Sequence, residues 1–286
     1  MNAPEPQRVL QPAGTGPGAT PPRTERAIGV AIVAMGGEGG GVLADWIVDM
    51  AEHAGCTAQT TSVPGVAQRT GSTIYYVEMI APDPSAAPDA PDPVLALMPV
   101  PGDVDVVIAS ELMEAGRAVQ RGLVTPDRTT LLASSHRTYA MGERTAMGDG
   151  RVDADRLRQG AALAARRFVC ADFARMAEES GSVVSAALFG ALAGSGALPF
   201  ARADFEGAIR RGGVGVDTSL AAFARGHDAA VAVPAADDAA SAGSKAAIFG
   251  FLGLVLGAVA AGFGARMGTD SKDDYNKYDR PVQEVR

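Results

Sequence analysis

Residues 28–55 read IGVAIVAMGGEGGGVLADWIVDMAEHAG, and this stretch decides the fold class. Ile28–Ala34 is a continuous apolar run, which is typical of a strand buried on both faces of a parallel sheet. After a glycine-rich turn, apolar residues recur at helical spacing from Val42, and Gly55 ends the helix. The stretch therefore predicts a strand, a turn and a helix, which is the repeating unit of an α/β protein.

The same unit recurs further along the chain. Val104–Ala109 predicts a strand, and Glu111–Arg121 predicts the helix that follows it. Beyond Ala171 the pattern is helical. Further strands are predicted at Thr57–Val63, Ser72–Ile80, Thr129–Ala133 and Arg167–Cys170. We therefore expect a three-layer α/β fold. Helices flank a mostly parallel sheet, a helical cap follows, and a separate hydrophobic helix lies at the C-terminus.

Composition divides the chain into five segments. They are a Pro/Gly-rich leader predicted to be disordered (1–26), the α/β domain (27–232), a linker (233–245), an apolar segment (246–265) and a polar tail (266–286).

The apolar segment reads AAIFGFLGLVLGAVAAGFGA and contains no charged residue. Its length is that of one membrane-spanning helix. Gly253 and Gly257 form a GxxxG pair, which lets two such helices approach closely. The segment is a candidate transmembrane helix, and the alternative is a buried apolar tail.

The charge and the cysteine count exclude several function classes. The chain has 25 Lys and Arg against 33 Asp and Glu, and no basic cluster interrupts the net charge of -8. Nucleic-acid binding is therefore disfavoured, because phosphate contacts need a basic stripe. Cys56 and Cys170 are too few for an iron–sulfur cluster and too far apart for a CxxC metal site. We expect a cytoplasmic protein, with membrane tethering through the apolar segment as the alternative.

The first glycine turn resembles a phosphate-binding loop but lacks its partners. Gly37, Gly39 and Gly40 can bring the backbone close to an anion at the start of the helix. The next predicted strand, however, offers no acidic residue for a ribose, and no Lys-Ser/Thr pair follows the glycines. Glu38 also places a negative charge in the turn. Nicotinamide, flavin and P-loop nucleotide binding are therefore disfavoured.

A second glycine turn lies between the next two predicted strands, in SVPGVAQRTGSTIYYVE. Gln68 and Arg69 stand there between Gly65 and Gly71. Arg69 offers a planar fork for a phosphate or a carboxylate, and the alternative is an ordinary surface arginine. Both turns follow strands, and ligands of open α/β sheets gather beyond the carboxyl ends of strands.

Four segments, in this order, carry a resemblance to a known family. Residues 34–39 (AMGGEG) correspond to G-x-G-G-Q-G, and residues 65–72 (GVAQRTGS) correspond to G-x-x-Q-R-G-G-S. Residues 104–124 and 180–200 resemble two further segments of the same family. The chain from 27 to 226 thus resembles the gamma-type domain of 2-oxoacid:ferredoxin oxidoreductases, especially the beta subunit of indolepyruvate ferredoxin oxidoreductases. Ala34, Glu38 and Thr70 depart from the family pattern.

The resemblance implies an enzyme subunit that is not catalytic alone. A larger alpha subunit is expected to hold thiamine diphosphate, Mg²⁺ and 4Fe-4S clusters, with coenzyme A as co-substrate, arylpyruvates as substrates and ferredoxin as acceptor. We expect this chain to bind no cofactor or metal by itself, and we assign it no catalytic residue. The residues expected to contact substrate or coenzyme A are Gly36, Gly37, Glu38, Gly39, Gly65, Gln68, Arg69 and Gly71.

Other polar residues carry weaker signals. His53, His136 and His227 stand without carboxylate or cysteine partners at metal-ligand spacing. His136, with Arg137, follows a predicted strand and is kept as a weak candidate at the ligand edge. Gly148–Gly150 is a GDG sequence without the Asn-containing stretch of a thiamine-diphosphate site, so a turn is expected. Two alternatives remain open: a stand-alone Rossmann-like cofactor-binding oxidoreductase, and a non-catalytic membrane-tethered scaffold.

Overall fold

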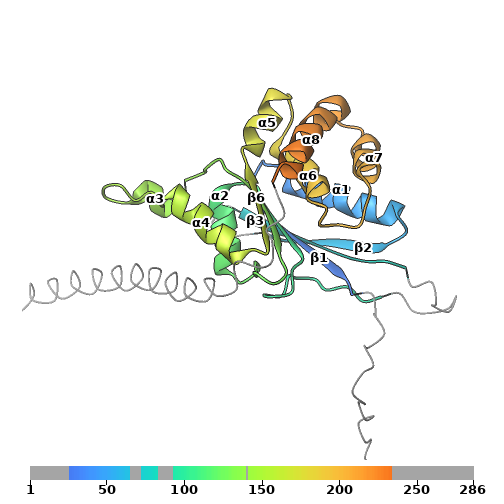
Figure 1. Ribbon diagram of the computed structural model, residues 1–286, viewed down its shortest axis with the longest axis horizontal. Helices are drawn as coiled ribbons and strands as arrows, with labels where there is room; N and C mark the ends of the chain where they lie inside the picture. Colours follow the sequence, from blue (N-terminus) through green and yellow to red (C-terminus); the bar gives the residue numbers. More distant parts are fainter. Residues whose placement is uncertain (1–25, 65–71, 83–92, 140, 234–286) are drawn as a thin grey trace, which may run out of the picture.

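The computed structural model describes residues 26–64, 72–82, 93–139 and 141–233, which form one sheet covered by helices on both faces (Figure 1). The candidate transmembrane helix and the second glycine turn lie outside the described residues. The strands are β1 (Ile28–Met35), β2 (Thr57–Pro64), β3 (Ser72–Ile80), β4 (Val106–Ala109), β5 (Thr130–Ser134) and β6 (Arg167–Ala171).

The six strands are ordered β2-β3-β1-β4-β5-β6. β1, β4, β5 and β6 pair in parallel, whereas β3 is antiparallel to both of its neighbours. The mostly parallel sheet predicted from the sequence is confirmed. The reversal at β3 was not predicted, and it has a simple cause. Only residues 65–71 join β2 to β3, and a parallel connection needs about a dozen residues or more.

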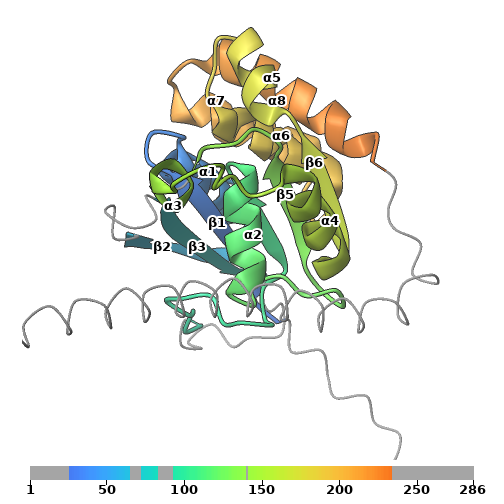
Figure 2. The same cartoon turned by 90° about the vertical axis from the view of Figure 1, so that its left-hand side faces the viewer.

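Eight helices accompany the sheet in the described part of the chain. They are α1 (Gly40–His53), α2 (Leu112–Gln120), α3 (Met141–Thr145), α4 (Ala154–Ala164), α5 (Phe173–Glu179), α6 (Val184–Ser195), α7 (Arg202–Gly212) and α8 (Val216–Val231). α1 and α5–α8 lie on one side of the sheet (Figure 1). α2 and α4 lie side by side over the other (Figure 2). The three layers and the helical cap agree with the sequence analysis, which did not predict α3 and α4.

The position of β1 in the centre of the sheet explains its continuous apolar sequence. Val30 and Ile32 face the core under α1 and α6, and Ala31 and Val33 face the core under α2 and α4. Both faces of β1 are thus covered, as expected for a strand without polar alternation.

No helix within the described ranges is long and apolar enough to cross a membrane.

Helix α6 forms the centre of the larger core. Nearly all its residues are buried, and a helix that is apolar all round has to be enclosed. The Phe189 ring contacts the rings of Phe205 and Phe223, at centroid distances of 5.0 and 5.9 Å. Gly190 and Gly226 let α6 and α8 approach until their backbones touch, because an ideal Cβ on either glycine would lie 1.9 Å from a carbonyl oxygen of the facing helix. The helical cap is therefore joined firmly to the domain.

Candidate functional site at the carboxyl edge of the sheet

The first glycine turn and both flanks of the second lie at one edge of the sheet. The register pairs Met35, the last residue of β1, with Ser72, the first residue of β3. Pro64, the last residue of β2, pairs with Thr73. The segment 65–71, which carries Gln68 and Arg69, lies outside the described residues, but both of its ends are fixed beside the first turn. This edge is also where β4, β5 and β6 end, the usual place for a ligand in such sheets.

The first turn needs glycine for its backbone. Gly37 and Gly39 have φ angles of +88° and +75°, in the left-handed region that residues with a side chain rarely adopt. No described atom lies within 4 Å of an ideal Cβ on Gly36 or Gly37, so these two residues face open space. A Cβ on Gly39, in contrast, would lie 2.5 Å from the Oγ of Ser185 in α6. Gly39 is therefore fixed both by its conformation and by the close approach of α6.

Helix α1 begins at this turn with its backbone N–H groups uncapped. Gly39 is the N-cap residue, and the first intrahelical bond is donated by the N–H of Leu43 to the carbonyl of Gly39. In the described structure no side chain caps this end, and the first helical turn contains no acidic residue. The buried hydroxyl of Ser185 has no partner among the described residues and faces the turn. Free N–H groups together with the helix dipole favour a negatively charged ligand here.

The Glu38 carboxylate turns inward and does not project from the turn. Its Oε2 accepts the backbone N–H of Met35 at 3.2 Å and the hydroxyl of Ser110. The expectation that Glu38 places its charge where an anion would sit is therefore corrected. The cause is the end of β4, where Ser110 directly follows the strand and lies beside β1.

His136 completes a network with this carboxylate. Its Nε2 lies 3.3 Å from Glu38 Oε1, and its Nδ1 lies 2.9 Å from Ser134 Oγ. The Ser134 hydroxyl also accepts the N–H of Ala174 in the first turn of α5, at 3.2 Å. We call Glu38, Ser110, Ser134 and His136 the rim network. It connects the turn after β1 with the ends of β4 and β5.

The network favours the ionised pair. The hydrogen bond to Glu38 raises the pKa of His136, although burial opposes this effect. For Glu38, burial alone would raise the pKa, but the hydrogen bonds from His136 and Ser110 outweigh it and the pKa is lowered. Sequence reasoning kept His136 only as a weak candidate and missed the two serines. The signal available was a hydroxyl at the end of β5 and another just after β4.

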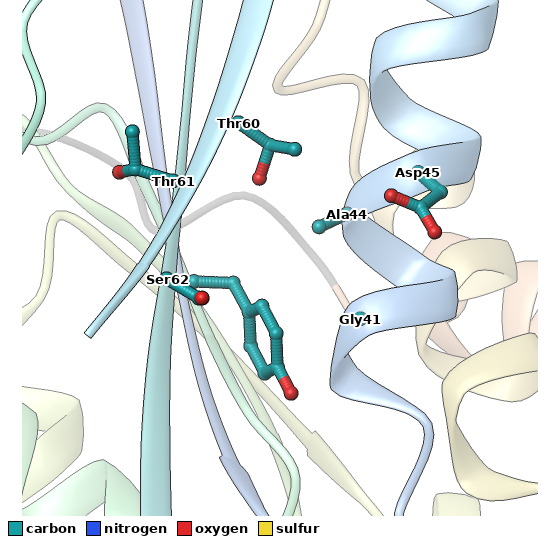
Figure 3. Close-up of a pocket in the computed structure, with 7 residues that line it drawn as sticks. Gly41, Ala44, Asp45, Thr60, Thr61 and Ser62 are labelled. Carbon is teal, nitrogen blue, oxygen red and sulfur yellow. The ribbon is translucent and has the colours of Figure 1, made fainter. Parts of the chain in front are cut away.

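A cavity of about 180 Å³ lies between α1 and the β2–β3 side of the sheet. Thr60 and Ser62 of β2 lie across from Gly41 and Ala44 of α1 (Figure 3). Tyr75 also lines the cavity, and its ring packs where a Cβ on Gly40 would otherwise stand. The small residues of α1 thus leave a polar recess beside the first helical turn, near the end of β2.

The other residues considered from the sequence lie outside the rim network. His53 Nδ1 lies 2.8 Å from the Asp49 carbonyl within α1. His227 contacts its neighbour Asp228 at 3.2 Å in α8. Arg137 pairs with Glu143 and holds the carbonyl of Val152, so it stabilises the segment around α3.

Metal and thiol chemistry find little support in the described residues. Asp149 of the GDG sequence lies in the loop after α3 and forms an exposed ion pair with Arg151. Within the described ranges no group of His, Cys, Asp and Glu has the arrangement to hold a metal ion. Burial raises the pKa of the Cys170 thiol to about 11, so that thiol is a poor nucleophile near neutral pH.

The comparisons with known proteins place the chain in a family. The model of the family described as pyruvate ferredoxin/flavodoxin oxidoreductase matches residues 29–229, which is most of the chain. No curated protein matches. The class is therefore that of a component of a 2-oxoacid:ferredoxin oxidoreductase. The chain belongs to the pyruvate ferredoxin/flavodoxin oxidoreductase family.

Solved structures show remote similarity. A pyruvate oxidoreductase subunit from Thermotoga maritima is 16% identical with a TM-score of 0.48, over 71% of this chain and 96% of that one. The gamma subunit of a keto/oxoacid ferredoxin oxidoreductase from Geobacter sulfurreducens is 14% identical with a TM-score of 0.47, over 72% and 99%.

A third similar structure is a 2-oxoglutarate:ferredoxin oxidoreductase from Magnetococcus marinus. It was solved with 2-oxoglutarate, coenzyme A and succinyl-CoA bound, and is 16% identical with a TM-score of 0.48. The similarity covers 74% of this chain and 32% of that longer chain.

Proposed function

We propose that this chain is the smaller subunit of an arylpyruvate (indolepyruvate):ferredoxin oxidoreductase. The larger subunit would hold thiamine diphosphate, Mg²⁺ and the 4Fe-4S clusters. The observation that carries the proposal is an uncapped helix N-terminus behind a glycine turn, at the ligand edge of a domain from this family. The arylpyruvate preference rests on the resemblance of the two glycine turns to those of the indolepyruvate enzymes.

The role of this chain in the proposal is to enclose an anionic group at the partner's active site. The backbone N–H groups at the start of α1 would bind a carboxylate of the 2-oxoacid or a phosphate of coenzyme A. Gly36 and Gly37 leave space for such a group. Gln68 and Arg69, which follow β2 at the same edge, would add side-chain contacts. The described residues therefore bind and orient, while cofactors in the partner supply the redox chemistry.

The number of thiols supports this division of labour. A 4Fe-4S cluster is held by about four thiolates, and the chain contains only Cys56 and Cys170. In this proposal the iron–sulfur path for electrons would run through another polypeptide.

The test uses the complex reconstituted with the larger subunit and compares two glycines. Gly37 and Gly55 have nearly the same positive φ, +88° and +85°, and neither has a described atom near its Cβ position. They lie at opposite ends of α1, about 20 Å apart. Gly37→Ala and Gly55→Ala thus impose a similar strain, of roughly 1–2 kcal/mol, at the site and away from it.

We expect Gly37→Ala to raise KM for the arylpyruvate or for coenzyme A, whereas Gly55→Ala leaves both values close to those of the wild type. Arg69→Ala should raise KM for the same ligand by about 10-fold or more, as expected for a lost charged hydrogen bond. Which KM rises identifies the anion as carboxylate or phosphate. If Gly37→Ala and Arg69→Ala have the same KM as the wild type for the arylpyruvate and also for coenzyme A, the placement of the site is refuted. Turnover by the isolated chain would refute the subunit role.

A further inference from the structure

An acidic side chain precedes a helix end that otherwise suits an anion. Glu38 lies one residue before Gly39, the N-cap of α1. A carboxylate free to move at this position would lie close to the N-terminal N–H groups of α1, where the helix dipole attracts negative charge. It would then compete with an anionic ligand and repel it. Something has to hold the Glu38 carboxylate away from the turn.

The structure assigns that role to His136, which we propose is a positioning residue of the anion site. It holds the Glu38 carboxylate inward and, when protonated, cancels its charge. The N-terminus of α1 is then left for the ligand. The inference rests on the proposed function, because it concerns the anion expected at the same turn. It adds a residue that stands 98 positions from Glu38 in the sequence.

Geometry supports the assignment because the imidazole is held on both sides. One ring nitrogen faces Glu38, and the other faces Ser134, whose hydroxyl is itself fixed by the N–H of Ala174. The backbone is fixed as well, since the carbonyl of His136 accepts the N–H of Leu112 at 3.1 Å. The ring can therefore hold Glu38 in place with little freedom of its own.

The charges around Glu38 also support the assignment of His136 as its positioning residue. Among the described residues, Glu38 is bonded to the N–H of Met35, to Ser110 and to His136, and only His136 can carry a positive charge. The acidic groups facing His136 are Glu38, Glu111 at the start of α2 and Asp172 at the start of α5. All three stabilise the imidazolium. Both side chains of the pair are partly buried, with 26% and 20% of their surfaces exposed, so solvent screens their interaction only in part.

The two protonation states of His136 have different consequences. A neutral ring still donates its Nε2–H to Glu38 but leaves a net negative charge beside the turn. The imidazolium leaves the pair neutral. Affinity for an anion should therefore fall as the pH rises through the pKa of His136. In Glu38→Gln the fall should shift to lower pH, because the imidazole loses the carboxylate that raises its pKa.

The test is a double-mutant cycle in the reconstituted complex, with His136→Ala, Glu38→Gln and the double variant. KM is measured for the arylpyruvate and for coenzyme A between about pH 6 and pH 9, a range that brackets the ordinary pKa of His. His136→Ala should raise KM for the anion bound at the turn by about 5- to 10-fold, and kcat should change less. In the Glu38→Gln background the same replacement should have little effect on KM at about pH 8 and above, where the imidazole is neutral. A double variant as impaired as His136→Ala would overturn the proposal.

A second measurement separates this inference from the proposed function. The full chain contains three histidines, which can be labelled with ¹⁵N and titrated by NMR, with His136→Ala assigning the resonance. We expect His136 to titrate above 6.5 in the wild type and closer to 6.5 in Glu38→Gln. An unchanged titration in Glu38→Gln overturns the pairing whatever the function. If the titration shows the pairing but no variant, including Gly37→Ala, changes KM, the proposed site is refuted. If Gly37→Ala raises KM but Glu38→Gln does not relieve the effect of His136→Ala, only the role of His136 is refuted.

Discussion

Nε2 of His136 lies 3.3 Å from Oε1 of Glu38, and the two residues follow strands that do not touch each other. β4 lies between β1 and β5, and the hydroxyl of Ser110, directly after β4, donates to the same carboxylate. The pair therefore exists only because three parallel strands end at the same level. This arrangement makes the turn after β1 sensitive to the protonation of a residue after β5.

The first prediction concerns the pH dependence of stability. The pKa of His136 is raised above 6.5, so its stabilisation is complete below about pH 6.5 and is lost as the pH rises through the folded-state pKa. The pKa of Glu38 is lowered below 4.5, so its stabilisation is present above that pH and is lost as the pH falls through the folded-state pKa. The pair should thus contribute most between these two values, by roughly 0.5–1 kcal/mol.

Urea unfolding of wild type, Glu38→Gln and His136→Ala at pH 5.5 and pH 9 (about one unit below and well above the ordinary pKa of His) measures this effect. Both variants should lose stability relative to the wild type at the lower pH and lose less at the higher pH. Packing changes act at both pH values and cancel in the comparison. A loss that is independent of pH would show that the pair does not ionise in the folded protein.

The second prediction concerns the buried ion pair of α2. The Glu114 side chain is fully buried and pairs with Arg117, one turn along the helix. Burial raises the pKa of Glu114, and the charge of Arg117 opposes that effect. Arg117→Met should therefore raise this pKa further and destabilise the domain by about 3 kcal/mol near pH 7, because a buried charge loses its partner.

The pH effect of Glu114 has the opposite sign to that of Glu38. A carboxyl group whose folded pKa is raised loses stability as the pH rises from 4.5 through that pKa, so the cost of Arg117→Met should shrink near pH 5. Adding Glu114→Gln should recover part of the lost stability at neutral pH. Equal costs of Arg117→Met at both pH values, measured by denaturant unfolding, would contradict a buried charged Glu114.

The third prediction concerns the contact between α6 and α8. A Cβ on Gly190 would lie 1.9 Å from the carbonyl oxygen of Phe223, and a Cβ on Gly226 would lie 1.9 Å from that of Ala187. Either alanine replacement forces the two helices apart and should lower the free energy of unfolding by about 2–3 kcal/mol. Gly142→Ala in α3 is the matched control, because no described atom lies within 4 Å of its Cβ position.

The control should be neutral or slightly stabilising, since alanine favours a helix over glycine. Thermal unfolding followed by circular dichroism gives all three values. Gly190→Ala and Gly226→Ala variants as stable as Gly142→Ala would show that α6 and α8 do not pack as closely as described.

Much of the fold could be predicted because its signals are local. The apolar run of β1, the helical spacing of α1 and the glycine at its end lie within 28 consecutive residues, 28–55. All six strands were predicted within one or two residues of their observed ends. Helices α3 and α4 were missed because they bury few residues and show little apolar periodicity. The antiparallel β3 was missed because strand direction depends on the length of the connection and not on the strand's own residues.

The candidate site divides in the same way. The conformational need for Gly37 and Gly39 is a property of a tight turn, and the sequence showed where that turn must be. The membership of Ser110 and Ser134 in the rim network is only weakly indicated by the sequence, since each looks like an ordinary polar residue at the end of a strand. What Glu38 does could not be predicted either. Its charge was evident, but its direction depends on hydroxyl and imidazole groups that come from two other strand ends.

The six strands, the helix after β1 and the glycine turn between them could be located from the sequence alone, because periodicity and backbone freedom act over a few neighbouring residues. The meeting of the first turn with both flanks of the second at one edge, and the contact of His136 with Glu38, are visible only in the folded protein. Those contacts depend on the order β1-β4-β5, which is set by hydrogen bonds between strands distant in the chain.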